Sequence, residues 1–192
     1  TFFLPTQRVL CMAEVCTQTQ HNLLTPRGAE VRDARMWAKV IDDALVRFGG
    51  RTDVLVNSHN WPVWGQDGVH QFMLEQRDIY KYVHDQTLRL ANHGMTIKEV
   101  GDALQEPDFA SDALHIRGNY GMLYFNARAV YQKYYGAFDG RAVDLNPLPP
   151  ETEGKRYLKA LGGEARVLEL AQEAIDEDDL QWAATLVNHA VF

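Results

Sequence analysis

The sequence predicts an α/β segment followed by an all-α segment. Between residue 1 and about residue 65, short apolar runs alternate with one helical pattern, and strand–helix–strand order is typical of an α/β layer. From Gln66 onward apolar residues recur at helical spacing, separated by Gly and Pro, which predicts a bundle or array of helices. With 192 residues, 46% of them hydrophobic, the chain can form one ordinary domain or two small ones around a real core.

The first segment contains three apolar runs with the character of strands. Residues 1–5 resemble the middle of a strand and lack an initiator Met, so we expect the chain to be a portion of a longer protein. Residues 9–13 and 53–57 predict buried strands. Between them a helix is expected over about residues 30–48, ending at the Gly pair that follows. Its apolar positions are Val31, Ala34, Trp37, Ala38, Ile41, Ala44, Leu45 and Phe48.

The second segment predicts helices of unequal length with no common repeat period. Thr96 opens a capping box, in which its hydroxyl accepts a hydrogen bond from a free backbone N–H and Glu99 reaches back. The longer helices are expected over about residues 67–92, 120–135, 152–161 and 164–175, and a last one begins near residue 178.

Composition excludes two classes of function. A net charge of −7 and a pI near 5.4 argue against a nucleic-acid-binding surface, which needs clustered Lys and Arg. No apolar run approaches the roughly 20 residues that cross a bilayer, so no transmembrane segment is expected. Cys11 and Cys16 lack the spacing of a redox or metal motif and are interpreted as two buried hydrophobic residues.

Two potential metal ligands follow two of the predicted strands. Glu14 comes directly after residues 9–13, and His59 comes shortly after residues 53–57. Metal and ligand sites gather at the carboxyl ends of strands in open α/β folds, and zinc accepts imidazole and carboxylate ligands. Each residue also has an ordinary interpretation, as a satisfied core histidine and as a solvated carboxylate. The pair therefore indicates only part of a metal site.

The segment between the strand at residues 9–13 and the helix carries an oxyanion-binding pattern. Arg27 lies between Pro26 and Gly28, and its planar guanidinium is a forked donor held on a loop, as a bound oxyanion requires. Together with Asn22, Arg27 favours a tetrahedral oxyanion over a thioester as the ligand.

These residues occur in an order that resembles a known family. Glu14, residues 21–29 (His-Asn-Leu-Leu-Thr-Pro-Arg-Gly-Ala) and residues 58–65 (Ser-His-Asn-Trp-Pro-Val-Trp-Gly) resemble the alkylsulfatases with a metallo-β-lactamase fold, which hydrolyse sulfate esters of alkyl chains such as dodecyl sulfate. The resemblance covers essentially the whole chain. It continues through Arg32-Asp33, Trp37 and residues 76–82, 84–90, 92–94, 117–121, 129–132, 138–140 and 182–184.

The resemblance implies how the chain is divided and what it contacts. Residues 1–76 would be the C-terminal portion of the αββα sandwich of a metallo-β-lactamase-like catalytic domain, and residues 77–192 a helical dimerisation domain. The implied partners are an alkyl sulfate substrate and a second copy of the chain in a homodimer. Because members of the family often carry an export signal, the resemblance favours a periplasmic or secreted protein, although the residues themselves leave the compartment open.

The resemblance also implies the roles of four residues. The family binds two zinc ions with an HxHxDH motif, two carboxylates and a last histidine. His59 matches that histidine and Glu14 matches one carboxylate, while Asn22 and Arg27 match the residues that hold the sulfate. No residue of this chain is assigned a catalytic role.

Two departures from the family pattern limit this assignment. The HxHxDH motif is absent, so the zinc ligand set is incomplete and the isolated chain is expected to be inactive. Phe125-Asn126 stands where many relatives have His-Asn, which removes a histidine that would assist proton transfer. Two alternatives stay open: a catalytically inert helical dimerisation module, and another hydrolase of the same fold acting on a thioester or phosphoester.

Three further features give structural expectations. Half of a sandwich would expose the inner face of its sheet, so the isolated chain is expected to oligomerise. The pairs Arg77-Asp78 and His84-Asp85 are expected to lock helices together. The aromatic-rich stretch at residues 120–138 is expected to form core and dimer contacts, or alternatively the wall of an alkyl-chain channel.

Overall fold

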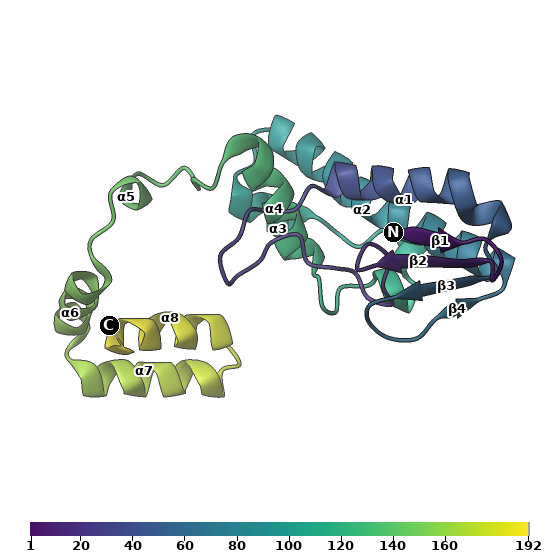
Figure 1. The fold of residues 1–192 in the computed structure, drawn as a ribbon. Coiled ribbons are helices and arrows are strands. Elements are labelled where there is room, and N and C mark those ends of the chain that lie inside the picture. Colours follow the sequence, from purple (N-terminus) through teal and green to yellow (C-terminus); the bar gives the residue numbers. More distant parts are fainter. Residues whose placement is uncertain (192) are drawn as a thin grey trace. The chain divides into compact units, whose positions relative to one another are not determined.

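The structure, a computed structural model, describes residues 1–191. The last residue of the predicted dimerisation domain, Phe192, lies outside the described residues. The chain folds into two compact units, Thr1–Gly140 and the residues from Arg141 onward (Figure 1). A small sheet near the N-terminus is followed by helices, as predicted. No helix in the described part of the chain is both long and apolar enough to cross a membrane.

The sheet consists of β1 (Phe2–Leu4), β2 (Val9–Ala13), β3 (Val54–Asn57) and β4 (Val63–Trp64), in that order. β2 and β3 are parallel, whereas each outer strand pairs antiparallel with its neighbour. Residues that follow β2 and β3 therefore emerge at the same edge of the sheet. The sequence does not predict β4, because two residues are too few to give an alternating pattern.

Helix α1 (Ala34–Phe48) connects β2 to β3. It begins at Ala34 rather than near residue 30, because Asp33 is its N-cap and accepts a hydrogen bond from the Met36 N–H at 3.0 Å. The helix ends at Gly49, as predicted, and a short 3₁₀ turn, η1 (Gly49–Arg51), leads into β3.

The remaining helices of this unit closely follow the sequence prediction. Helix α2 (Gln66–Asn92) matches the expected long helix, and α3 (Ile97–Ala103) begins with the expected capping box at Thr96 and Glu99. Two 3₁₀ turns, η2 (Asp108–Ala110) and η3 (Leu114–Ile116), precede α4 (Leu123–Tyr135). Helix α4 starts a few residues later than expected, because the Gly-rich stretch before it is irregular.

One face of the sheet and the helices share a single core. Leu10 and Met12 alternate along β2 and are fully buried, as is Leu55 of β3. Figure 1 shows α1 and α2 side by side over the sheet. Among the fully buried side chains that the helices contribute to this core, the largest include Ile41, Met73, Ile79 and Tyr80.

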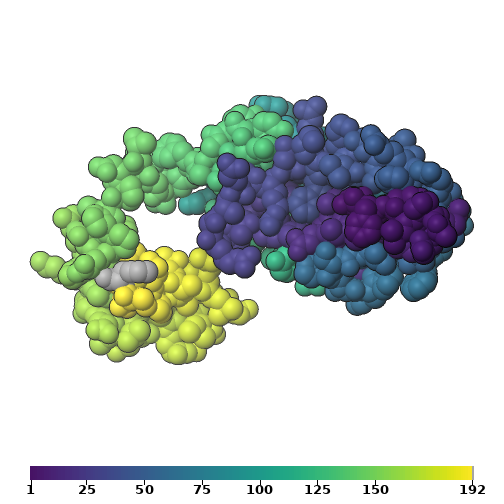
Figure 2. Space-filling view, in the orientation of Figure 1, coloured from purple at the N-terminus to yellow at the C-terminus, as the bar shows by residue number. Residues whose placement is uncertain are grey.

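The opposite face of the sheet is apolar and incompletely covered. The strand register aligns its side chains in one layer, and β1 lies at the surface in the space-filling view of Figure 2. Phe2, Leu4 and Trp64 are 57%, 42% and 71% exposed. The other members of this layer, all partly buried, are Val9, Cys11, Val54 and Val56. The predicted open apolar sheet face is therefore present in the fold.

Polar pairs join the helices as predicted. Arg77 of α2 binds Asp42 of α1 at 2.9 Å, and His84 of α2 contacts the Tyr134 hydroxyl of α4 at 2.9 Å. The aromatic stretch differs from its expected core role: Tyr120, Phe125, Tyr134, Tyr135 and Phe138 are exposed. Helix α4 instead buries a face of small and aliphatic residues, with Leu123, Ala127, Ala129 and Val130 among them.

The second unit contains α5 (Ala142–Leu145), α6 (Pro150–Leu161), α7 (Glu164–Asp176) and α8 (Leu180–Val191). Its small core is centred on Val167, Ala171 and Leu186. Asp179 accepts a hydrogen bond from the Trp182 N–H at 3.0 Å, so the acidic run before α8 provides a helix cap. The expected boundary between the catalytic and dimerisation domains, at residues 76 and 77, lies within the continuous helix α2. This division into two domains stays a prediction.

Candidate metal and oxyanion site

Glu14 is directed out of the sheet by a distortion at the end of β2. The β2–β3 register shifts between Cys11 and Ala13, and Ala13 has a φ of +49°, which is unusual for a residue with a side chain. The Ser58 N–H donates to the Ala13 carbonyl at 3.1 Å and so ties the two strand ends together. Such local distortion is common next to functional sites, because it redirects a side chain.

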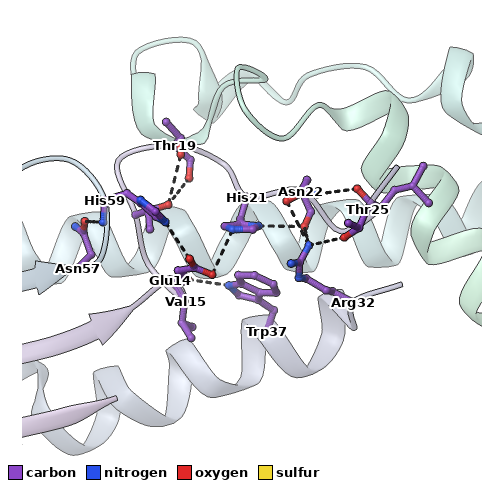
Figure 3. A network of polar contacts seen from close by, with 12 residues as sticks. Glu14, Val15, Thr19, His21, Asn22, Thr25, Arg32, Trp37, Asn57 and His59 are labelled. Atoms are coloured by element: carbon purple, nitrogen blue, oxygen red, sulfur yellow. Dashed lines mark hydrogen bonds and ion pairs between the residues drawn. The ribbon is translucent and has the colours of Figure 1, made fainter. Parts of the chain in front are cut away.

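His59 meets Glu14 at this rim. The Asn57 side chain accepts a hydrogen bond from the His59 N–H at 3.2 Å, and Asn60 follows with a φ of +69°. This turn brings His59 Nε2 within 2.9 Å of Glu14 Oε1, as Figure 3 shows. Both side chains are more than half exposed, so neither is the core residue that was one interpretation of His59.

His21 is the third group at the rim. Its Nε2 lies 3.8 Å from the second oxygen of Glu14, so the carboxylate lies between two imidazoles (Figure 3). The His21 ring packs between Trp37 and Tyr120, with centroid separations of 5.4 and 5.3 Å. The hydrogen bond with His59, followed by the nearby charges of His21 and Arg32, keeps the pKa of Glu14 below its usual value despite some desolvation.

Asn22 is held by its own loop. Its side-chain amide donates to the Leu24 carbonyl at 2.8 Å, and the Arg32 guanidinium donates to its backbone and side-chain oxygens at 2.9 and 3.3 Å. Arg32 also donates to the Thr25 hydroxyl at 3.0 Å. Because a carboxamide carries two N–H donors, one donor of Asn22 stays available to a ligand.

Arg27 lies apart from the other predicted site residues. It is exposed on a turn closed by a hydrogen bond from the Gly28 N–H to the Thr25 carbonyl at 3.1 Å. Within residues 1–191, Arg27 is exposed and forms no hydrogen bond or ion pair. The structure therefore brings Glu14 and His59 into contact and links Asn22 to them through His21, but it does not bring Arg27 to them.

A cavity of about 250 Å³ adjoins the rim. Its lining combines hydroxyl, imidazole and phenol groups, from Thr17, Thr19, His21, His59, Asn60 and Tyr120. Within the described chain, no three His, Cys, Asp or Glu side chains are grouped tightly enough to hold a metal ion on their own. The donors Glu14 and His59 fit zinc in kind, as carboxylate and imidazole, but are fewer than the four ligands that zinc normally takes.

Sequence reasoning does not find every residue of this site. Arg32 and Tyr120 lie in segments that resemble the family, but the sequence pattern does not assign either residue to the site. Asn126 contacts the backbone on both sides of Asn22 from more than a hundred positions further along the chain. No local sequence signal reports such a contact.

Comparison with known proteins identifies the family. A family model described as alkyl sulfatase dimerisation matches residues 96–192. This chain therefore belongs to the alkyl sulfatase dimerisation family, and the resemblance drawn from its motifs is confirmed.

Similar proteins extend the match over the whole chain. The chain is 46% identical over 191 residues to an (R)-specific secondary-alkylsulfatase of Pseudomonas sp, covering 99% of this chain and 29% of that protein. It is 45% identical to the alkyl/aryl-sulfatase BDS1 of Saccharomyces cerevisiae, covering 99% and 29%. The structure of the stereoselective inverting sec-alkylsulfatase Pisa1 from Pseudomonas sp. matches with a TM-score of 0.94 and 46% identity, covering 99% of this chain and 30% of that one. The chain thus spans less than a third of the length of these relatives.

Proposed function

We propose that this chain is part of a zinc-dependent alkylsulfatase that hydrolyses alkyl sulfate esters to an alcohol and sulfate. One observation carries the proposal: the Glu14 carboxylate lies between His59 and His21 at a strand rim, in a chain that belongs to the alkyl sulfatase dimerisation family. Membership of that family and the names of the similar proteins support sulfate ester hydrolysis at the level of the family.

Glu14 and His59 are the residues of this chain proposed to hold zinc. Both lie on an accessible rim, and their direct 2.9 Å contact would be exchanged for coordination when the metal binds. Bound zinc would supply a water of lowered pKa and would offset negative charge on the departing sulfate. The remaining ligands would come from a part of the protein that precedes these residues in the family order.

Asn22 and Arg27 are the residues proposed to bind the sulfate group. Arg27 offers an unpaired, solvent-facing guanidinium, whose fork fits two sulfate oxygens at once. Asn22, which follows His21 in the chain, offers one amide N–H beyond the one that it donates to the Leu24 carbonyl. Because the Arg27 side chain is exposed and forms no hydrogen bond or ion pair in the described chain, no such interaction has to be broken when it turns toward an anion.

The uncovered sheet face supports the proposal that the first segment is half of a metallo-β-lactamase sandwich. A sheet face with Phe2, Leu4 and Trp64 exposed is unusual for an independent soluble domain, and a second sheet packed over it would bury these side chains. We further propose that the helical part forms a homodimer, in keeping with its family.

The test is sulfate release by the native full-length polypeptide that contains this chain, with dodecyl sulfate and a secondary alkyl sulfate as substrates. Release of sulfate that stops on removal of zinc and returns on its addition is the expected result. An enzyme that hydrolyses thioesters or phosphoesters but leaves alkyl sulfates intact would overturn the proposal.

The 192-residue chain alone tests the alternative of an inert module. The absence of a three-ligand group within residues 1–191 favours an isolated chain without tightly held zinc. Elemental mass spectrometry of the purified chain is expected to find well under one zinc ion per chain. About two ions per chain would mean that the ligands of this chain suffice, contrary to the division of the site proposed here.

A further inference from the structure

The segment from Gln20 to Leu23 carries the proposed sulfate ligand and lies in no helix or strand. Several of its backbone groups are nevertheless paired with residues distant in the chain. The Gly121 N–H donates to the Gln20 carbonyl at 2.7 Å, and the His21 N–H donates to the buried Tyr80 hydroxyl at 2.8 Å. Backbone groups paired in this way cannot shift without losing hydrogen bonds that water does not replace in a buried setting.

One side chain pairs with this segment twice. The Asn126 amide donates to the His21 carbonyl at 3.1 Å, and its carbonyl oxygen accepts from the Leu23 N–H at 2.7 Å. The carboxamide thus acts as a neighbouring strand would, bonding the residues before and after Asn22. Asn126 is fully buried, so both bonds are protected from competition with water.

Close packing enforces the same placement. A Cβ atom added at Gly121 would lie 2.3 Å from the His21 carbonyl oxygen, so only glycine fits at this approach. Gly121 precedes α4 and Asn126 lies within it, and both belong to the residues that match the dimerisation family. Helix α4 and the turn before it therefore pack against the loop that carries Asn22.

We propose that Asn126 is a positioning residue for sulfate binding, which fixes Asn22 by pairing with the backbone on both of its sides. This inference rests on the proposed sulfate contact of Asn22. It gives the helical region a second role beside dimerisation, since the geometry of the anion site depends on a side chain of α4.

The test is a double-mutant cycle in the native full-length polypeptide. N126A is expected to raise KM for an alkyl sulfate about tenfold, with a smaller change in kcat, as the loss of two buried hydrogen bonds loosens Asn22. N22A should raise KM by a similar factor. If Asn126 acts through Asn22, the double variant should have the KM of N22A alone within about twofold. Additive effects, or an unchanged KM in N126A, would overturn the inference.

Two further variants accompany the cycle, one at a buried residue outside the proposed site and one at Asn126 itself. Thr87 is fully buried in α2 and its hydroxyl has no partner among the described residues, so T87V should leave KM unchanged. If N126A does not fold, N126D is taken through the same cycle, since it keeps the volume and the acceptor for the Leu23 N–H but loses the donor to His21.

Amide hydrogen exchange in the 192-residue chain tests the contact without any activity. The Leu23 N–H should exchange at least about tenfold faster in N126A than in the wild-type chain, and an unchanged rate would overturn the inference. A wild-type enzyme that leaves alkyl sulfates intact would instead refute the proposed function. The two failures are therefore distinguishable.

Discussion

Glu14 Oε1 and His59 Nε2 lie 2.9 Å apart although 45 positions separate the two residues in the chain. The contact exists because β2 and β3 are parallel neighbours and each residue follows the end of its strand. A hydrogen-bonded carboxylate–imidazole pair on an accessible rim is a plain structural feature by itself. The metal role proposed for it rests on the second imidazole of His21 and on membership of the alkyl sulfatase dimerisation family.

The first prediction concerns the metal-binding role of His59. In the native full-length polypeptide, H59A is expected to lower zinc content and to reduce kcat by about a hundredfold or more, because a metal ligand is lost. Zinc is measured by elemental mass spectrometry and activity by sulfate release. The matched control is H93A, since His93 is an exposed histidine at the end of α2. Equal zinc content in the two variants would refute the metal role of His59.

The second prediction separates two arginines of the same loop. Arg27 is exposed and forms no hydrogen bond or ion pair in the described chain, so R27A should change the free energy of unfolding by less than about 0.5 kcal/mol while weakening sulfate binding. Arg32 donates to Asn22 and Thr25, so R32A should cost about 1–3 kcal/mol of stability. Urea unfolding and inhibition by inorganic sulfate measure the two effects. The assignment of Arg27 fails if R27A binds sulfate as the wild type does.

Sequence reasoning reaches furthest where one local pattern decides the structure. The capping box at Thr96, the end of α1 at Gly49 and the long helix α2 all follow from spacing and composition. The meeting of Glu14 and His59 is also predictable, because parallel strands share one carboxyl edge.

What the sequence does not reveal depends on contacts between distant positions. Asn126 is one asparagine on a helix, and its role follows from the approach of α4 to residues 20–23 rather than from any local pattern. The aromatic stretch misleads for a related reason. Helix α4 buries its small residues, such as Ala127 and Ala129, and leaves the larger rings at the surface. Helical period alone does not determine which face turns inward when both faces are apolar.

The third prediction concerns acid stability at the start of α1. Burial alone would raise the pKa of Asp33, but hydrogen bonds from the Met36 N–H and attraction to Lys133 outweigh it and keep the pKa below its usual value. A depressed pKa stabilises the fold above the unfolded-state pKa of about 3.9, and this stabilisation is lost as pH falls through the lower folded-state pKa. Stability should therefore decrease below about pH 4.

Two variants separate the charge of Asp33 from its cap. D33A should cost about 1 kcal/mol at pH 7, whereas D33N keeps a good N-cap and loses only the charge. Thermal unfolding at pH 7 and pH 3 measures the difference. The advantage of the wild type over D33N should shrink toward pH 3, and a constant difference would contradict the assigned role of the charge.

The fourth prediction concerns the proposed dimer. Trp182 of α8 is 50% exposed, so part of its indole is open to contact with a partner. W182A is expected to raise the dimer dissociation constant about tenfold or more, because large aromatic side chains dominate interface energies.

The exposed residue next to Trp182 provides the control, because Q181A should leave the dissociation constant unchanged. Sedimentation equilibrium of the 192-residue chain measures both, and circular dichroism checks that the helices are intact. If the wild-type chain stays monomeric at micromolar concentration, the homodimer proposal for this chain is wrong. If the chain dimerises but W182A dimerises equally well, the interface lies on another surface of the helical segment.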